Sequence, residues 1–399
     1  MTVIATAVLV LVGLVLLVWM ARAATVYSSR TRGPVLSAET IPDAGPQGLV
    51  SVVVPAKDEE SNIEPALETL LAQDYPDLEI IVVDDRSTDG TAKIVRRVAE
   101  RDARVRLVQV TDLPEGWFGK PHAMHVGAAE ARGRWLLFVD ADCRQAPHSV
   151  RAGVHFLADA AGDVLSLWPV LEMHGFWENT VQPVAGSVLA AWFRPGWVND
   201  PNRRTAFANG QYILMRRETY DAVGGHEAVR SEMVEDIAMA RLVKGAGHRL
   251  LNAVGRDLFT TRMYDSLGAM YRGWARIYSG GFKRPGLLLA VMAATCTFTL
   301  VPYMALAGSA AAVAAGVRDA WVLVTLGLAG AALVFLLITM RRFFQLGRAN
   351  PWSLVFYPMA VVLVLVFEAG AMVRALGLAG VTWRGTTYKG GRVVGKGGA

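Results

Sequence analysis

Long runs without a charged side chain stand at both ends of the chain. The first covers residues 1–21, and three more cover residues 285–317, 320–340 and 349–367. A helix needs about 20 apolar residues to cross a bilayer. The pattern therefore predicts an integral membrane protein with an N-terminal transmembrane anchor at 1–21 and about three transmembrane helices within 285–380. Because the run that begins at Pro285 is long and contains Pro302, three and four C-terminal spans both remain open.

The polar stretch between these runs alternates between two periodicities. Short, mostly apolar runs at 49–55, 79–83, 105–110 and 135–139 predict strands, and the first of them is nearly continuous in β-branched residues. Apolar residues at helical spacing follow at 61–71, 91–101 and 122–131. At the start of the first of these segments, Ser61 and Glu64 have the spacing of a capping box. This alternation predicts an α/β domain with a mainly parallel sheet.

Acidic residues come where two of the predicted strands end. Asp84 and Asp85 follow the second strand, and Asp140 and Asp142 follow the fourth. In open α/β sheets ligands bind at the carboxyl ends of the strands, so the two pairs would face one site. Their repulsion is costly unless a cation or ligand hydroxyls offset it. Aspartates that only cap loops are the alternative.

Composition and charge change this picture in two ways. Of the 399 residues, 53% are hydrophobic and 19% are charged, which excludes a disordered chain. The chain has two cysteines, which argues against a disulfide framework or a cysteine-rich metal site. The net charge of +5 would suit a nucleic-acid partner. However, residues 286–399 carry 9 basic and 2 acidic side chains, so the rest of the chain has a net charge of −2. The basic excess therefore belongs to membrane loops and tail, and we expect no nucleic-acid partner.

Basic residues also predict the orientation in the membrane. No Lys or Arg precedes the first apolar run, and Arg22, Arg30 and Arg32 follow it, which favours an uncleaved anchor over a signal peptide. The positive-inside rule then places the polar domain in the cytoplasm of a multi-pass protein of the inner or cell membrane. Three C-terminal spans would leave the tail outside, although the tail is basic and has no acidic residue. That conflict stays open at this point.

Five segments, in order, resemble family-2 glycosyltransferases with the GT-A fold. They are VSVVVPAKDEESNI (50–63), EIIVVDDRSTDGT (79–91), WLLFVDADC (135–143), NGQYILMRRETYDAVGGH (209–226) and EMVEDIAMARLVKGAG (232–247). The segments LPEGWFGKPHAM (113–124) and WRGTTY (383–388) are similar to a branch that glycosylates carotenoids, hopanoids and ceramide-like lipids. The resemblance implies a GT-A glycosyltransferase domain at 48–261, between a linker at 22–47 and a juxtamembrane amphipathic segment at 262–284. A basic tail at 381–399 ends the chain.

The resemblance also implies a nucleotide-sugar donor, with a UDP-sugar favoured, and a divalent metal, Mg²⁺ or Mn²⁺. A metal lowers the barrier to departure of the diphosphate, and both ions prefer carboxylate oxygens. Asp142 and Asp140 are the implied metal residues. The implied donor-binding residues are Pro55, Lys57, Asp58, Glu59, Asp85, Lys120 and Asp140. Candidates for acceptor or phosphate contacts are Asn209, Gly210, Arg272, Trp274 and Arg276.

An inverting transfer to a hydroxyl needs a base opposite the leaving diphosphate. Asp236, with Glu235 beside it, stands where the family carries its acidic pair, and Asp236 is the implied base. If the segment is helical, the spacing puts Glu232 on the same face as Glu235 and Asp236. The alternative is a solvated acidic face at a helix N-terminus.

A lipid-like acceptor is expected to approach through aromatic segments near the membrane. Apolar residues from Trp177 to Trp192 recur at helical spacing, interrupted by Pro183, and predict a helix in the membrane interface or one packed on the domain's own core. The resemblance thus predicts an inverting, metal-dependent transferase that moves a sugar to a hydroxyl of a membrane lipid.

Three other functions remain as alternatives. A polyprenyl-phosphate sugar synthase is the nearest, because its acceptor is a phosphate. A processive polysaccharide synthase is disfavoured, since Tyr271-Arg272-Gly273-Trp274 lacks the Gln of the family's QxxRW motif. A non-catalytic membrane protein is disfavoured because the carboxylates at Asp140, Asp142 and Asp236 are all present.

Overall fold

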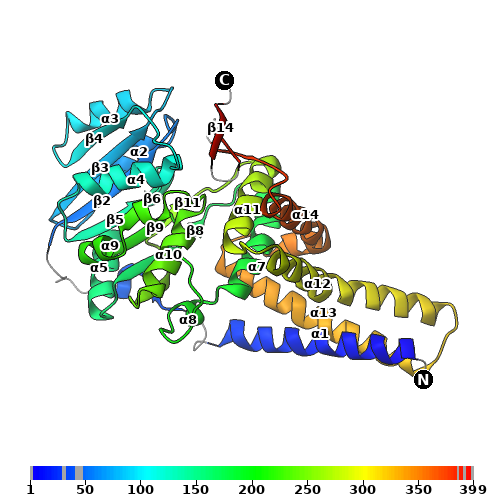
Figure 1. The fold of residues 1–399 in the computed structure, drawn as a ribbon. Coiled ribbons are helices and arrows are strands. Elements are labelled where there is room, and N and C mark those ends of the chain that lie inside the picture. Colours follow the sequence, from blue (N-terminus) through cyan, green and yellow to red (C-terminus); the bar gives the residue numbers. More distant parts are fainter. Residues whose placement is uncertain (1–2, 29–32, 41–47, 384–385, 390–391, 397–399) are drawn as a thin grey trace. The chain divides into compact units, whose positions relative to one another are not determined.

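The computed structural model describes residues 3–28, 33–40, 48–383, 386–389 and 392–396. It divides the chain into two compact units (Figure 1). The α/β unit comprises Gly33–Glu172, Phe193–Met263 and Gly377–Ala399, and the helical unit comprises Met1–Arg32, Met173–Trp192 and Tyr264–Leu376. Parts of the predicted linker and of the predicted basic tail, including Arg384, lie outside the described residues.

The α/β unit is built on an eight-stranded sheet. Its strands, in spatial order, are β1 (Val35–Leu36), β10 (Leu250–Gly255), β7 (Val164–Trp168), β9 (Tyr212–Arg216), β5 (Trp135–Val139), β2 (Val50–Ala56), β3 (Leu78–Asp85) and β4 (Val105–Val110). β9 runs antiparallel to both of its neighbours, and every other neighbouring pair is parallel. The prediction of a mainly parallel sheet is therefore confirmed.

The β-branched runs explain why the strands lie where they do. In β2, Val53 is paired with Ile81 of β3 and with Phe138 of β5, and all three side chains are buried. Continuous apolar strands suit a sheet that is covered on both faces. All four predicted strands are present, and their carboxyl ends place the acidic residues at one edge of the sheet.

Helices and two small sheets complete the α/β unit. The helices are η1 (Ala38–Thr40), α2 (Ile63–Leu71), α3 (Thr91–Ala99), α4 (Gly119–Glu130), α5 (Ser149–Asp159), α8 (Pro195–Val198), α9 (Arg217–Ala222), η2 (Gly225–Val229) and α10 (Glu235–Gly245). The small sheets are β6 (Cys143–Gln145), β11 (Phe259–Thr261) and β8 (Val170–Leu171), and then β12 (Val381–Trp383), β13 (Thr386–Lys389) and β14 (Arg392–Lys396). The three predicted helices are confirmed. The predicted capping box is wrong, because Asn62 precedes α2 and its side chain donates to Glu59 Oε2 at 2.9 Å.

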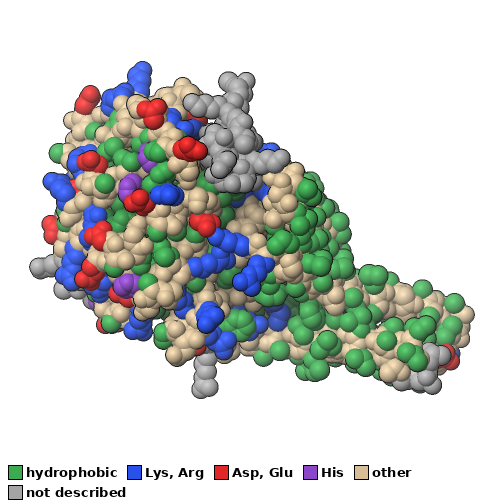
Figure 2. All heavy atoms as spheres, in the orientation of Figure 1, with side chains coloured by type: hydrophobic (Ala, Val, Ile, Leu, Met, Phe, Trp, Pro, Cys, Tyr) green, Lys and Arg blue, Asp and Glu red, His purple; other side chains and the backbone are tan. Residues whose placement is uncertain are grey.

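The helical unit contains four helices that are long and apolar enough to cross a membrane. They are α1 (Val3–Tyr27), α12 (Pro285–Ala314), α13 (Ala320–Leu346), and α14 (Tyr357–Ala375) with the preceding η3 (Pro351–Phe356). Their most apolar windows have mean hydropathies of 2.9, 1.8, 2.5 and 2.1. Figure 2 shows hydrophobic side chains over the long helices. Since α12 continues through Pro302 as one helix, three long C-terminal helices follow, as expected.

Three shorter helices belong to the same unit: α6 (Phe176–Thr180), α7 (Gln182–Trp192) and α11 (Leu267–Gly281). The predicted helix from Trp177 to Trp192 is divided at Val181. α7 begins with Gln182 and Pro183, and a proline in the first turn costs no helical hydrogen bond. α7 packs against α13 and α14, so its apolar face is covered within the helical unit.

Candidate active site

Lys120 lies at the centre of the acidic residues that follow the strands. Its Nζ is 2.7 Å from Asp140 Oδ1 and 2.9 Å from Glu235 Oε1. Lys120 is in the first turn of α4, Asp140 directly follows β5, and Glu235 is the first residue of α10. One ammonium group therefore joins three segments that are far apart in the sequence.

Asp236 is held by the backbone in a fixed orientation. The N–H of Gly210 donates to its Oδ2 at 2.8 Å, and the N–H of Ile237 donates to its Oδ1 at 2.7 Å. A Cβ at position 210 would lie 3.1 Å from Asp236 Oδ2 and 3.2 Å from Lys120 Nζ. Glycine thus lets the backbone approach both groups closely.

The environment sets the protonation of these groups. Burial and the neighbouring Glu235 carboxylate raise the pKa of Asp236 to about 7, although Lys120 and the two backbone N–H groups act in the opposite direction. Burial lowers the pKa of Lys120, but Asp140, Glu235 and Asp236 outweigh it and raise that pKa above its ordinary value. Lys120 is therefore charged at neutral pH, and Asp236 can take up or release a proton there.

Asp142 is a buried carboxylate whose negative charge Lys120 and the Cys143 thiol offset only in part. Burial, followed by repulsion from Asp140 and Glu59, raises its pKa to about 7. The Cys143 thiol, 3.6 Å away, is a weak donor to it, and burial keeps the pKa of that thiol high. Such a carboxylate fits a divalent cation. Among the described residues no group of three or more His, Cys, Asp or Glu side chains could hold a metal, so water and donor phosphates would have to complete the coordination.

Asp85 forms an ion pair with its neighbour Arg86. Arg86 Nε donates to Asp85 Oδ1 at 2.8 Å, and Arg86 Nη2 donates to Oδ2 at 3.0 Å. A Cβ at Gly119 would collide with Asp85 Oδ2, so the start of α4 lies directly against this carboxylate. Arg86 and Gly119 both stand inside the motifs quoted above but were not among the predicted site residues.

The residues after β2 form hydrogen bonds with the residues after β3. Asp58 Oδ1 accepts a hydrogen bond from the Thr88 N–H at 2.8 Å, and the Glu59 N–H donates to Thr91 Oγ1 at 2.9 Å. Lys57 is half-buried, and burial with repulsion from Arg86 lowers its pKa despite three nearby aspartates. Pro55 lies within β2 opposite Val83 of β3. This loop pair forms one wall at the carboxyl ends of the strands.

Trp117, just before α4, forms a further cluster with His122 and His125 of α4. The Trp117 ring centroid lies 5.2 Å from that of His122 and 5.1 Å from that of His125. Burial lowers the pKa of His122, and its Nδ1 is buried without a hydrogen-bond partner among the described residues. The quoted segment 113–124 contains Trp117 and His122, but only Lys120 was selected from it.

The other predicted residues fall in two places. Asn209 Nδ2 donates to Gln211 Oε1 at 3.1 Å, beside Gly210. Arg272, Trp274 and Arg276 lie on α11 in the helical unit, where Trp274 is buried and Arg272 is exposed. The expectation that Glu232 shares a helical face with the acidic pair is wrong, because α10 begins only at Glu235.

Comparison with known proteins identifies the domain. Residues 51–224 match the model described as glycosyl transferase family 2. Residues 51–224 are therefore similar to a glycosyl transferase family 2 domain. The resemblance found in the sequence motifs is thereby confirmed.

A curated relative of this family 2 domain is the 4,4'-diaponeurosporenoate glycosyltransferase of Staphylococcus aureus (strain USA300). It is 26% identical over 256 residues, which are 61% of this chain and 64% of the relative. The protein of the same name from strain MRSA252 is 26% identical over 255 residues, with the same coverage. The chain thus spans just under two thirds of the length of these relatives.

A solved structure with the same fold is the mannosyltransferase PcManGT from Pyrobaculum calidifontis in complex with GDP-Man and Mn²⁺. The TM-score is 0.54 at 22% sequence identity, and the match covers 94% of this chain and 98% of the other. At this identity the likeness shows the fold, and it confirms the predicted GT-A architecture of the family 2 domain.

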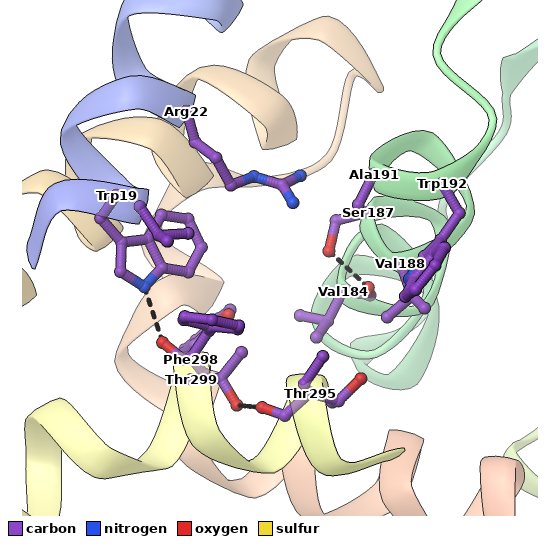
Figure 3. A pocket seen from close by; sticks show the side chains of 13 residues that line it. Trp19, Arg22, Val184, Ser187, Val188, Ala191, Trp192, Thr295, Phe298 and Thr299 are labelled. Atoms are coloured by element: carbon purple, nitrogen blue, oxygen red, sulfur yellow. Dashed lines mark hydrogen bonds between the residues drawn. The ribbon is translucent and has the colours of Figure 1, made fainter. Parts of the chain in front are cut away.

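The helical unit that accompanies the family 2 domain has a pocket of its own (Figure 3). It lies between α1, α7, α12 and α14 and has a volume of about 90 Å³. Trp19, Trp192 and Phe298 supply aromatic walls, and Trp19 Nε1 donates to the Phe298 carbonyl at 2.6 Å. Figure 3 shows Arg22 reaching from α1 towards Ser187 of α7. Apolar walls with one cation suit an amphipathic molecule.

Proposed function

We propose that this protein is an inverting, metal-dependent glycosyltransferase that moves a sugar from a nucleotide-sugar donor to a hydroxyl of a lipid-like acceptor. The observation that carries the proposal is the cluster around Lys120, where Asp140 and Glu235 share one ammonium group beside the oriented Asp236. The family 2 match supports the reaction class.

Asp142, with Asp140 next to it, would hold Mg²⁺ or Mn²⁺ at the donor diphosphate. When bound, the ion would neutralise the charge of the leaving diphosphate. Lys57 and Arg86 supply further positive charge at the carboxyl ends of β2 and β3. A UDP-sugar is our favoured donor, with Asp85 contacting the base. The Mn²⁺ and GDP-Man of the Pyrobaculum mannosyltransferase support the use of a metal and a nucleotide sugar.

Asp236 acts as the base towards the acceptor hydroxyl in this proposal. Each of its oxygens accepts one backbone hydrogen bond, which leaves a lone pair on each for the hydroxyl proton. A pKa of about 7 lets the carboxylate be ionised before transfer and accept the proton during it. Glu235 stays on Lys120 and fixes the first turn of α10.

The acceptor and the membrane are proposed from the helical unit. Four helices of membrane-spanning length support a multi-pass protein in the inner or cell membrane, and Arg22 after the first run supports a cytoplasmic catalytic domain. The carotenoid-type relative supports a lipid-like acceptor. We assign the pocket of Figure 3 to one end of that acceptor, because its aromatic and apolar walls with Arg22 beside them suit an amphipathic molecule.

The test is a donor screen with the full-length protein in detergent, with Mn²⁺ or Mg²⁺, followed by mass spectrometry of lipid extracts. Transfer should require the metal, so activity that persists in EDTA would refute the metal assignment. Asp236→Asn should reduce transfer to an alcohol to a small residual rate, whereas the exposed control Asp221→Asn should not. If Asp236→Asn leaves transfer to a lipid phosphate largely intact, the acceptor is a phosphate, as in the polyprenyl-phosphate alternative, because an anionic oxygen needs no base.

A further inference from the structure

The direction of the last long helix bears on how often the chain crosses the membrane. α12 leads away from α11, and α13 returns beside it, with Gly330 of α13 next to Leu306 of α12. At the end of α13, the Phe343 ring and the Trp274 ring of α11 both lie 4.0 Å from the position of a Cβ at Gly186. α13 therefore ends at the level of α7 and α11, which is the side where α12 began.

α14 contacts its neighbours in reverse order along the chain. The ring centroids of Tyr357 and Tyr303 are 6.5 Å apart at the start of α14. Eleven residues later Glu368 Oε1 accepts a hydrogen bond from Thr295 Oγ1 at 2.8 Å. Near its end Arg374 Nη1 donates to the carbonyl of Arg272, on α11, at 3.2 Å. As α14 advances, its partners move from the middle of α12 back to the segment before α12.

This order makes α14 antiparallel to α12. A helix that carried the chain back across a bilayer after α13 would have to run in the same direction as α12. In Figure 1, α1, α12 and α13 lie side by side, whereas α14 lies against α11 and the first part of α12. The length and apolarity of α14 would allow a crossing. However, α14 runs from beside the middle of α12 back towards the side where α12 began.

η3 and α14 expose apolar side chains that indicate a lipid environment. Trp352 and Val355 of η3 are 84% and 75% exposed, and Val362, Val366 and Val373 form an exposed apolar stripe on α14. The polar side chain Glu368 is turned inward and fully buried. Exposed apolar surface of this kind requires a partner, and for helices continuous with membrane-spanning ones that partner is lipid.

We propose that η3 and α14 form a re-entrant segment, which inserts into one leaflet of the bilayer and leaves it on the same face. The chain then crosses the membrane three times, by α1, α12 and α13. The residues after α14 then lie on the same face of the membrane as the residues before α12. Arg341 and Arg342 in the last part of α13, Arg348 after it and the basic tail are then on one side, and the conflict with the positive-inside rule disappears.

Thiol labelling of the full-length protein in sealed vesicles of known orientation tests this proposal. Leu378, just after α14, is 71% exposed, and Leu378→Cys would be compared with Val317→Cys between α12 and α13 and with Glu115→Cys in the α/β unit. Cys296→Ser removes the exposed native thiol, and Cys143 is buried. An impermeant maleimide should label positions 378 and 115 from one face and position 317 from the other.

Labelling of position 378 from the same face as position 317 would overturn the proposal, because α14 would then cross. A second measurement does not depend on thiol reactivity. Green fluorescent protein or alkaline phosphatase is fused to the C-terminus of the full chain, and protease access to the reporter is compared with access to the α/β unit. Opposite accessibility would also overturn the proposal. Neither measurement needs sugar transfer, so the outcome is independent of the proposed function.

Discussion

At the scale of single residues, Lys120 shows what the chain alone could and could not reveal. The motif around it indicated a phosphate contact, whereas the structure shows ion pairs to Asp140 and Glu235. These pairs depend on α4, β5 and α10 meeting at one point, which no local pattern encodes. The acidic residues were easier to find, because carboxylates directly after buried strands stand out in a sequence.

Arg86 and Gly119 were beyond prediction for a related reason, as was the contact that the predicted Gly210 makes with Asp236. Their roles arise from close approaches between distant segments, such as the N–H of Gly210 against Asp236. Glu232 was misplaced because spacing alone did not show that α10 begins at Glu235.

Lys120→Met should lower kcat/KM by about 100-fold or more, since it removes positive charge from the site where the diphosphate charge develops. It should also lower the free energy of unfolding by about 1–3 kcal/mol, because it leaves the buried Glu235 without its partner. Steady-state kinetics and thermal unfolding measure both effects. Lys93→Met, at an exposed position of α3, is the matched control. Unchanged kinetics for Lys120→Met would contradict a catalytic part for this ammonium.

The pH dependence of transfer should report Asp236. Burial and Glu235 raise its pKa to about 7, and a base must be ionised to accept a proton. We therefore expect kcat/KM to increase as the pH rises through about 7, and to be lower at more acidic pH, where Asp236 is protonated. The profile is measured at saturating metal between pH 5 and 9. The residual activity of Asp236→Asn should lack this acidic limb, and an identical limb in that variant would assign it to another group.

At the scale of elements, the strands were the most predictable parts. Short apolar runs of strand length, separated by helical patterns, indicate strands, and β2, β3, β4 and β5 lie where the pattern placed them. Helix beginnings were less certain, since Asn62 rather than Ser61 precedes α2. The direction of α14 could not be predicted, because apolar periodicity gives the length of a helix and not the order in which it contacts its neighbours.

The pocket between α1, α7, α12 and α14 yields a prediction at this scale. Ala191→Phe would fill the space beside Trp192 and should raise the KM for a lipid acceptor about tenfold, while the KM for the donor stays unchanged. Ala311→Phe, at an exposed position of α12 outside the pocket, is the control. Equal acceptor KM values in the two variants would remove the pocket from acceptor binding.

At the scale of the whole molecule, the division into two units explains the composition. The basic, apolar character of the chain belongs mainly to the membrane segments and their flanks, and the part before residue 286 has a net charge of −2. Sequence patterns predicted both units, since hydropathy and strand–helix alternation are strong signals. The domain boundaries themselves stay predictions.

Membrane integration can be measured directly. Long apolar helices should keep the protein in membranes after an alkaline carbonate wash, while detergent should release it. Immunoblotting of the two fractions shows the result, with a known peripheral protein as the control. Release by carbonate would contradict an integral protein.

The ion pairs of Lys120 also determine when the site can form. Lys120 and Asp140 are synthesised well before Glu235, and the residues between them include β7 and the antiparallel strand β9. Contacts between residues so distant in sequence close late in folding, because the intervening chain must first be ordered. During synthesis the donor end of the site can therefore assemble while the base is still missing. An emerging chain that stops at the end of the matched segment, residue 224, has no Asp236 and therefore lacks the proposed base.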